Sequence, residues 1–250
     1  VIGQDASGAQ QTWAQPTTSL VEEGATAADL SERVFKQAGI GADVQTGSYG
    51  WFLNSLTSPF NKNVTLSTVQ VNESTWKSWQ FFVNGKMANV GAGNYTLKAG
   101  DKVSWVYGSD GTMPGQTKAS LQIIGADSGG NVQTWAPAAD YTMVDAATVA
   151  DATELAFKQS GISADYGMGT WGWFLNSITS PFDGRTLAWD STTGAYWKLF
   201  IDGKPSDLGA GSVKLKDAKS IAWVYTADDK LPDPDALTTD PNAPKSNFDS

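Results

Sequence analysis

The side chains of this chain that could carry chemistry are mainly carboxylates, because the sequence contains no cysteine and no histidine. Their absence excludes a zinc site of the usual nitrogen and sulfur type, a Ser-His-Asp triad and a histidine pH switch. If the chain is an enzyme, a mechanism that uses two carboxylates is still compatible with this composition. Four acidic positions recur at one spacing along the chain: Asp5/Asp127, Asp29/Asp151, Glu32/Glu154 and Asp43/Asp165.

These carboxylates are explained without catalysis. Turns and a solvated helix face account for all four pairs, and no spacing places two of them around one substrate. Oxygen ligands for a metal occur at residues 127–131 and 228–229, but neither stretch has the regular ligand spacing of a calcium loop. We therefore predict that the chain is not an enzyme and has neither catalytic nor metal-binding residues.

The shared spacing comes from a tandem duplication. Residues 1–60 align without a gap with residues 123–182, and about half of these positions are identical. Residues 79–107 then match residues 197–225 after the register slips by four. A period of about 120 residues is a whole domain, not a solenoid unit. We predict two repeats, 1–115 and 116–230, followed by a Pro/Asp-rich tail or linker at 231–250.

Each repeat reads as a hairpin, a helix and several strands. The hairpin spans Ile2 to Trp13, with turn residues between two alternating runs. The helix begins after a Thr-x-x-Asp capping signal at Thr26 or Thr148, and Gly39 or Gly161 marks its end. Later strands alternate apolar and polar residues around Asn-Gly or Asp-Gly turns. The predicted fold class is α+β, with a mostly antiparallel or mixed sheet and one packed helix in each repeat.

Eleven tryptophans invite a hypothesis of ligand stacking. Most recur in both repeats on strands beside aliphatic residues, which favours core packing: Trp13/Trp135, Trp51/Trp173, Trp79/Trp197 and Trp105/Trp223. Trp76 and Trp189 have no counterpart and lie where the repeats diverge, at 61–78 and 183–196. We predict that these two are exposed and meet a ligand or partner. Trp171, which aligns with Tyr49, is a further candidate pair.

A polar pair lies within an otherwise apolar run of each repeat. Asn54 and Ser55 in the first copy correspond to Asn176 and Ser177 in the second. One interpretation is that they satisfy backbone groups at a strand end or turn. The other is that they form the polar rim of a ligand groove.

The motif order resembles the transcobalamin-like C-terminal domain family. The residues that carry this resemblance are the Gly-Trp-Phe-Leu-Asn-Ser stretches at 50–55 and 172–177, then Trp79, Phe82, Asn84 and Gly85, and Trp197, Phe200, Asp202 and Gly203. Membership implies a β-grasp-type fold. The family includes the smaller cobalamin-contacting domain of vertebrate cobalamin carriers and repeats in secreted or wall-attached proteins of Gram-positive bacteria.

The formal net charge of −9 argues against nucleic acid and anionic membranes as partners. No apolar run approaches the roughly 20 residues that a membrane-spanning helix needs. We predict a non-catalytic extracellular module pair of a bacterial surface protein, in adhesion or as a stalk, without a cofactor. Its partner would be a host or cell-wall surface component. The alternative is a small-ligand carrier, with cobalamin as the ligand that the resemblance suggests.

Overall fold

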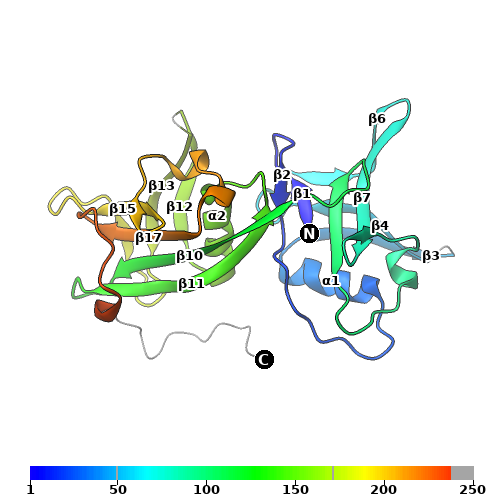
Figure 1. Cartoon of the computed structure of the whole chain (residues 1–250), viewed down its shortest axis with the longest axis horizontal. Helices are drawn as coiled ribbons and strands as arrows, with labels where there is room; N and C mark the ends of the chain where they lie inside the picture. Colours follow the sequence, from blue (N-terminus) through cyan, green and yellow to red (C-terminus); the bar gives the residue numbers. More distant parts are fainter. Residues whose placement is uncertain (49, 171, 238–250) are drawn as a thin grey trace. The chain divides into compact units, whose positions relative to one another are not determined.

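The computed structural model describes residues 1–48, 50–170 and 172–237, and Figure 1 shows its secondary-structure elements. The chain divides into two compact units, Val1–Gln116 and a second that begins at Thr117. Each unit therefore holds one of the two sequence repeats, and each is described by itself.

The first unit contains one α-helix and a larger number of strands. In chain order its elements are β1 (Ile2–Gln4), β2 (Gln10–Thr12), α1 (Ala27–Gln37), β3 (Gly41–Gly47), β4 (Gly50–Thr57), β5 (Thr65–Ser67), β6 (Val69–Asn72), β7 (Thr75–Val83), β8 (Lys86–Met87), the 3-10 helix η1 (Ala92–Asn94) and β9 (Val103–Gly108).

The second unit repeats this order. Its elements are β10 (Gln116–Ala126), β11 (Val132–Val144), α2 (Val149–Ser160), β12 (Ala164–Gly169), β13 (Gly172–Thr179), β14 (Thr186–Ala188), β15 (Tyr196–Ile201), β16 (Lys204–Pro205), η2 (Ala210–Ser212), η3 (Leu215–Asp217), β17 (Ser220–Thr226) and η4 (Pro234–Ala236). Strand β6 of the first unit has no counterpart among the described residues of the second, which agrees with the divergence expected there.

Each unit is built from two sheets, not the single sheet that the sequence suggested. In the first unit one sheet has the order β2-β1-β9-β7-β6, with β8 paired to β7, and the other has the order β3-β4-β5. The second unit has the matching orders β11-β10-β17-β15-β16 and β12-β13-β14. Strand β1 runs parallel to β9, and β10 runs parallel to β17. The larger sheet is therefore mixed, as predicted, and the smaller one is antiparallel.

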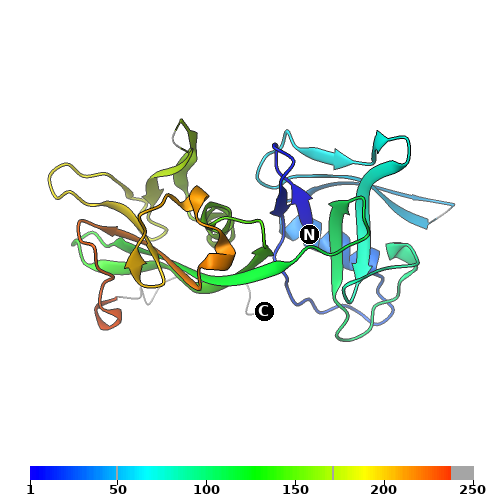
Figure 2. The ribbon, with the colours of Figure 1, turned by 45° about the horizontal axis from the view of Figure 1, so that its top comes forward.

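The two helices begin as the sequence predicts. The side chains of Thr26 and Thr148 accept the backbone N–H of Asp29 and Asp151, whose carboxylates accept the threonine N–H groups in return. These reciprocal bonds satisfy orphan donors at each helix start. Gly161 ends α2 with a φ of 67°, a left-handed conformation that costs glycine little. Figure 2 shows α2 nearly end-on, and α2 contacts strand β11.

Buried aromatic rings join the helix to both sheets. In the first unit Phe35 of α1 packs with Trp105 of β9, whose indole N–H donates to Ser31 of α1 at 2.8 Å. Trp223 of the second unit donates to Thr153 of α2 at 2.9 Å. Of the strand tryptophans that we assigned to the core, three pairs are buried, as predicted: Trp13/Trp135, Trp79/Trp197 and Trp105/Trp223. Trp51 and Trp173 are only half-buried.

A second apolar cluster lies on the other face of the larger sheet in the second unit. Ile124, Phe200 and Val224 are buried there, with Leu231 and Leu237 packed against them. The predicted tail or linker therefore packs against the second unit through Leu231 and Leu237. Exposing an apolar sheet face to water is unfavourable. Leu231 and Leu237, on either side of the short helix η4, cover this face.

Candidate binding surface

The polar pair of each repeat lies in a β-bulge within a strand. Asp43 pairs with Ser55 while Val44 pairs with Leu53, so Asn54 is the extra residue of β4. The same shift leaves Asn176 as the extra residue of β13. A bulge re-aims a side chain and is frequent beside binding sites. The prediction of a strand end or turn at this place is wrong, because the ladder continues on both sides of the bulge.

The bulge opens onto the side of the smaller sheet that faces away from the core. Asn176 donates its side-chain N–H to the carboxylate of Asp165 at 3.0 Å. Beyond the bulge, two threonine hydroxyls face each other across neighbouring strands in both repeats. Their Oγ1 atoms lie 2.9 Å apart in Thr57/Thr65 and again in Thr179/Thr186. Asn176 is exposed, whereas Asn54, Ser55 and Ser177 are half-buried.

An exposed phenylalanine precedes the bulge in each repeat. Phe52 is 59% exposed and Phe174 is 40% exposed, although their strand neighbours pack inward. In the second unit the Phe174 ring lies over the backbone of two glycines of β12. A Cβ added at Gly169 would lie 3.1 Å from the ring, and one added at Gly167 would lie 3.6 Å from it. Sequence reasoning missed this pair; the signal was an identical aromatic residue at an outward position of both strands.

The two unmatched tryptophans are exposed. Trp76, on β7, is 53% exposed, and Trp189, directly after β14, is 69% exposed. Trp76 lies opposite Gln70 in the β6–β7 hairpin, which stands away from the body of its unit in Figure 1. Tyr49 and Trp171, the other aromatic candidates, lie outside the described residues.

Glu154 differs from the solvated carboxylate that the sequence suggested. It is half-buried on α2 and accepts the indole N–H of Trp173 at 2.7 Å. Burial raises the pKa of its carboxyl group, while the bond from Trp173 acts in the opposite direction. Glu32 accepts the matching bond from Trp51 at 2.5 Å but is exposed. The shared role of these glutamates is to position a tryptophan of the strand.

A groove of about 290 Å³ lies at one side of the second unit. Its wall consists of aromatic and aliphatic side chains from β13, β15 and β17, and of the loop before η2: Trp173, Leu175, Tyr196, Trp197, Leu199, Leu208 and Trp223 among others. Lys198 contributes to it while its ammonium group donates to Asp229 at 2.7 Å. Ser206 and Asp207 also line the groove, so its surface is about equally polar and apolar.

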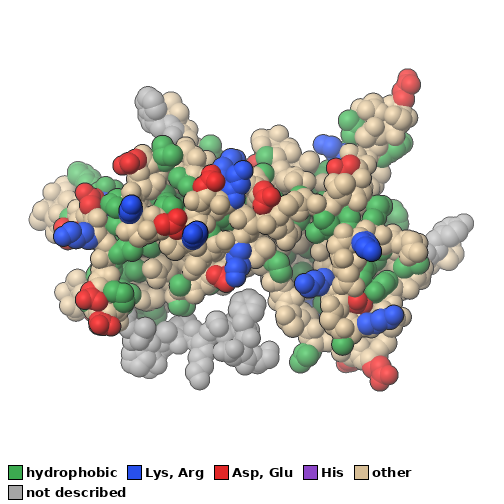
Figure 3. Space-filling model, in the orientation of Figure 1, with side chains coloured by type: hydrophobic (Ala, Val, Ile, Leu, Met, Phe, Trp, Pro, Cys, Tyr) green, Lys and Arg blue, Asp and Glu red, His purple; other side chains and the backbone are tan. Residues whose placement is uncertain are grey.

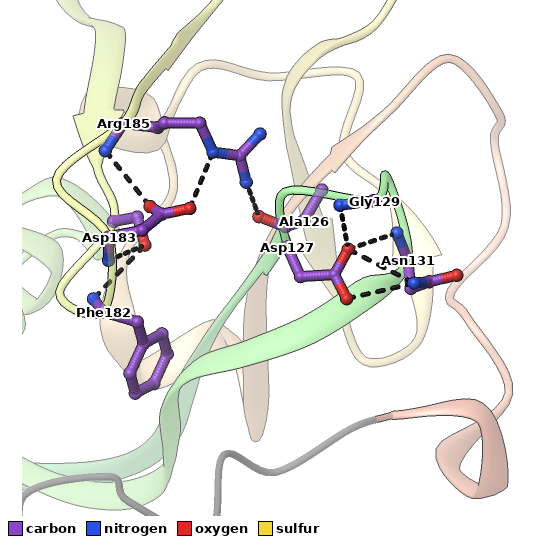
Figure 4. Close-up of polar contacts among 8 residues, drawn as sticks. Ala126, Asp127, Gly129, Asn131, Phe182, Asp183 and Arg185 are labelled. Carbon is purple, nitrogen blue, oxygen red and sulfur yellow. Dashed lines mark hydrogen bonds and ion pairs between the residues drawn. The ribbon is translucent and has the colours of Figure 1, made fainter.

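Two polar loops close one end of the second unit (Figure 4). Arg185 pairs with Asp183 at 2.7 Å and donates to the carbonyl oxygen of Ala126 at 2.9 Å. The bond from Arg185 lowers the pKa of Asp183 to about 2. Asp127 accepts hydrogen bonds from the side chain and the backbone N–H of Asn131 and from the N–H of Gly129, which lower its pKa. These carboxylates are satisfied by the protein itself, as turn residues usually are.

Among the residues that the structure describes, no group of three or more acidic side chains is arranged to hold a metal ion. Within the same parts of the chain, no helix has the length and apolar character needed to cross a membrane. Acidic and basic side chains are interspersed on the face shown in Figure 3, with hydrophobic side chains scattered between them.

One family model matches both repeats. Its description is "Domain of unknown function (DUF4430)", and it matches residues 24–109 and 146–227. These matches cover more than half of the chain. The chain belongs to this family. Each DUF4430 match runs from just before the helix to the end of the last strand of the larger sheet, so it includes the bulged strand. No curated protein matches the chain.

Proposed function

We propose that the two DUF4430 domains are a non-catalytic pair of binding modules from a bacterial surface protein, acting in adhesion or as a stalk. The observation that carries the proposal is the exposure of Trp76 and Trp189, each in a segment where the repeats differ. A rigid aromatic side chain that the fold leaves in solvent is the residue type most enriched at binding hot spots. Function usually lies on such variable segments of a rigid scaffold.

Further support comes from how the other aromatic donors are used. Trp79 and Trp197 donate to backbone carbonyls of the smaller sheet at 2.8 Å, and Trp105 and Trp223 donate to helix hydroxyl groups. These tryptophans fix the fold, which leaves Trp76 and Trp189 with no equivalent structural role. The helix packed on a mixed sheet is compatible with a β-grasp-type, transcobalamin-like domain, and we propose that assignment. The secreted setting rests on the resemblance to wall-attached repeats.

Co-sedimentation with purified Gram-positive cell walls tests the adhesion role. We expect the protein to pellet with the walls, and we expect Trp76→Ala combined with Trp189→Ala to abolish most of that binding. Leu20→Ala is the matched control, because Leu20 is 92% exposed and lies outside the divergent segments. Binding that the tryptophan variant retains in full would overturn the assignment of these residues. Absence of binding to cell walls and to immobilised host matrix proteins would overturn the adhesion role.

A small-ligand carrier is the second candidate, and the groove of the second unit, which combines aromatic rings with polar side chains, favours it. Cobalamin is the ligand that the resemblance suggests, and its absorbance makes the test direct. If the groove binds it, the red chromophore should elute with the protein on gel filtration, and Leu208→Arg should prevent this. Leu208 lines the groove and is largely exposed, so this substitution should not disturb the core. Elution of all chromophore as free cobalamin would exclude the carrier role for this ligand.

A further inference from the structure

The side of the smaller sheet that faces away from the core carries the same six side chains in both repeats. We call these positions the outer face of each repeat. In the first repeat they are Asp43, Phe52, Asn54, Ser55, Thr57 and Thr65, and in the second they are Asp165, Phe174, Asn176, Ser177, Thr179 and Thr186.

Two other positions on the same side differ between the repeats, Gln45/Gly167 and Ser67/Ala188, so the identity of the six needs an explanation. Only about half of the aligned positions in the first 60 residues of the repeats are identical. Outward positions of a strand tolerate many residue types, because packing does not decide them. The six outward side chains that are the same in both repeats are therefore retained for a reason other than folding.

The phenylalanine is the clearest case, because exposing its ring to water is unfavourable. Phe174 has a partial structural reason, since its ring covers Gly167 and Gly169 of the neighbouring strand. Phe52 lacks this reason: it pairs with Gln45, and a Cβ added at Gly47 would meet nothing within 4 Å. The ring is present in both repeats although the backbone beneath it differs, so covering glycines does not account for it.

The chemistry of the outer face suits a sugar chain. One exposed aromatic ring is followed along its strand by an amide and hydroxyl groups, and the two neighbouring strands add a carboxylate and a further hydroxyl group. An aromatic face packs against the C–H groups of a sugar ring, while hydroxyl, amide and carboxylate groups exchange hydrogen bonds with sugar hydroxyls. From Phe174 to Thr179 the strand extends roughly 16 Å, which is long enough for an extended ligand.

Charge decides between sugar polymers. The one ionised group among the six is a carboxylate, and the whole chain carries a formal net charge of −9. Both charges repel an anionic polymer and are compatible with a neutral one. We propose that the outer face of each repeat binds a neutral polysaccharide. This inference rests on the proposed function, since it names the class of partner that a binding module would take.

Two identical faces on one chain also favour a polymer over a small sugar. A polymer with repeating units offers sites to both faces, and the second contact then forms at a high effective concentration wherever the geometry allows it. In the second repeat the bond from Asn176 to Asp165 fixes the amide and the carboxylate relative to each other. Such preorganisation lowers the entropy lost on binding.

Native affinity electrophoresis tests the proposal with the whole chain. The gels contain mannan, dextran, laminarin or hydroxyethylcellulose as neutral probes, and polygalacturonate as the anionic one. We expect retardation in at least one neutral gel, and a rise in the dissociation constant of roughly tenfold or more for Phe52→Ala combined with Phe174→Ala. Phe52→Trp combined with Phe174→Trp should retain binding, because a larger ring still offers a flat apolar face.

The controls separate this inference from the proposed function. Unchanged far-ultraviolet circular dichroism of the alanine variant shows that it is folded, and if it is not, the Thr57→Val and Thr179→Val pair replaces it. Leu20→Ala, at an exposed position outside both outer faces, should leave migration in the neutral gels unchanged. The inference would be overturned if no neutral gel slowed the wild type or if polygalacturonate alone slowed it. It would also be overturned if the outer-face variant were slowed as much as the wild type. Sedimentation with cell walls would still report on the tryptophans.

Discussion

The two repeats differ strongly around the exposed Trp76 and Trp189 and little around the bonded Trp105 and Trp223. Trp105 and Trp223 are buried, and each donates to a hydroxyl group on the helix, although one acceptor is serine and the other threonine. Trp76 and Trp189 lie in segments of different structure, a strand pair in one unit and a turn in the other. Duplication has thus preserved the bonded aromatic framework and left the surface beside it free to change.

A second difference concerns the segment that follows the last strand. In the second unit Lys198 donates to Asp229 at 2.7 Å and to the carbonyl oxygen of Ala227 at 3.3 Å. In the first unit the equivalent Gln80 accepts the N–H of Gly111 at 3.2 Å. Both residues are buried and hold the chain where it leaves the sheet. The same anchoring is achieved with an ion pair in one unit and a neutral bond in the other.

The largest effect should come from the shared framework. Trp105→Ala and Trp223→Ala should each lower the free energy of unfolding of their own unit by roughly 3–5 kcal/mol, because each removes a large buried ring and leaves a cavity. Urea denaturation followed by circular dichroism measures the loss. A loss below about 1 kcal/mol for either variant would mean that the two units do not share this framework.

Removing the hydroxyl acceptor should have the next largest effect. Thr153→Val keeps the shape of the side chain but leaves the indole N–H of Trp223 buried without a partner, which costs roughly 1–3 kcal/mol. Ser31→Ala should act similarly on Trp105. Thr153→Ser is the matched control, because it retains the hydroxyl group and exchanges one repeat's acceptor for that of the other. Equal losses for the valine and serine variants would show that the bond contributes little.

The segment after the last strand should make a smaller contribution. Leu231→Ala should destabilise the second unit by roughly 1–2 kcal/mol, less than a fully buried leucine, because this side chain is half-buried. Leu20→Ala should have almost no effect, since Leu20 is exposed. The difference in urea midpoint between these two variants is the measurement. Identical midpoints would mean that the segment does not stabilise the sheet it covers.

Glu154 of α2 should make the stability of the second unit depend on pH. The pKa of Glu154 is raised by burial from its ordinary 4.5, so the folded unit holds this proton more tightly than the unfolded chain. The stability associated with the neutral acid is fully present below the unfolded pKa and is lost as pH rises through the folded pKa. Glu154→Gln should remove this loss while still accepting the bond from Trp173.

Thermal melts across the acidic and neutral range measure that response. Near neutral pH, Glu154→Gln should match or exceed the wild-type melting temperature, and its advantage should shrink as pH falls. Glu32→Gln is the control from the other repeat, where the exposed carboxylate keeps its water. A Glu154→Gln variant with the same pH profile as the wild type would remove this difference between the repeats.

The smallest effect on stability should come from the exposed tryptophans. Trp76→Ala and Trp189→Ala should each change the free energy of unfolding by no more than about 0.5 kcal/mol, because surface substitutions rarely do more. Acrylamide should quench less of the remaining fluorescence in either variant than in the wild type. Unchanged quenching would mean that both rings are shielded from solvent, which would contradict the proposed binding role.

The sequence by itself determined the features that depend on local chemistry and on duplication. The capping threonines Thr26 and Thr148 bond the residues three positions on, so their role can be predicted without a fold. Recurrence of strand tryptophans between apolar neighbours was enough to place Trp105 and Trp223 in the core. The same comparison between repeats identified Trp76 and Trp189 as the aromatic residues that the fold does not require.

Only the tertiary structure decided what depends on strand pairing and on contacts between distant segments. The bulge at Asn54 exists because the pairing register of β3 and β4 shifts there. The local amino-acid sequence does not specify that register. Glu154 is half-buried because Trp173 lies against it, 19 residues away along the chain. Leu231 and Leu237 looked like parts of a linker, since an apolar face that accepts them forms only when β10, β15 and β17 are side by side. Short sequence patterns determine hydrogen bonds between nearby residues, whereas the burial of a side chain depends on which strands pair in the folded sheet.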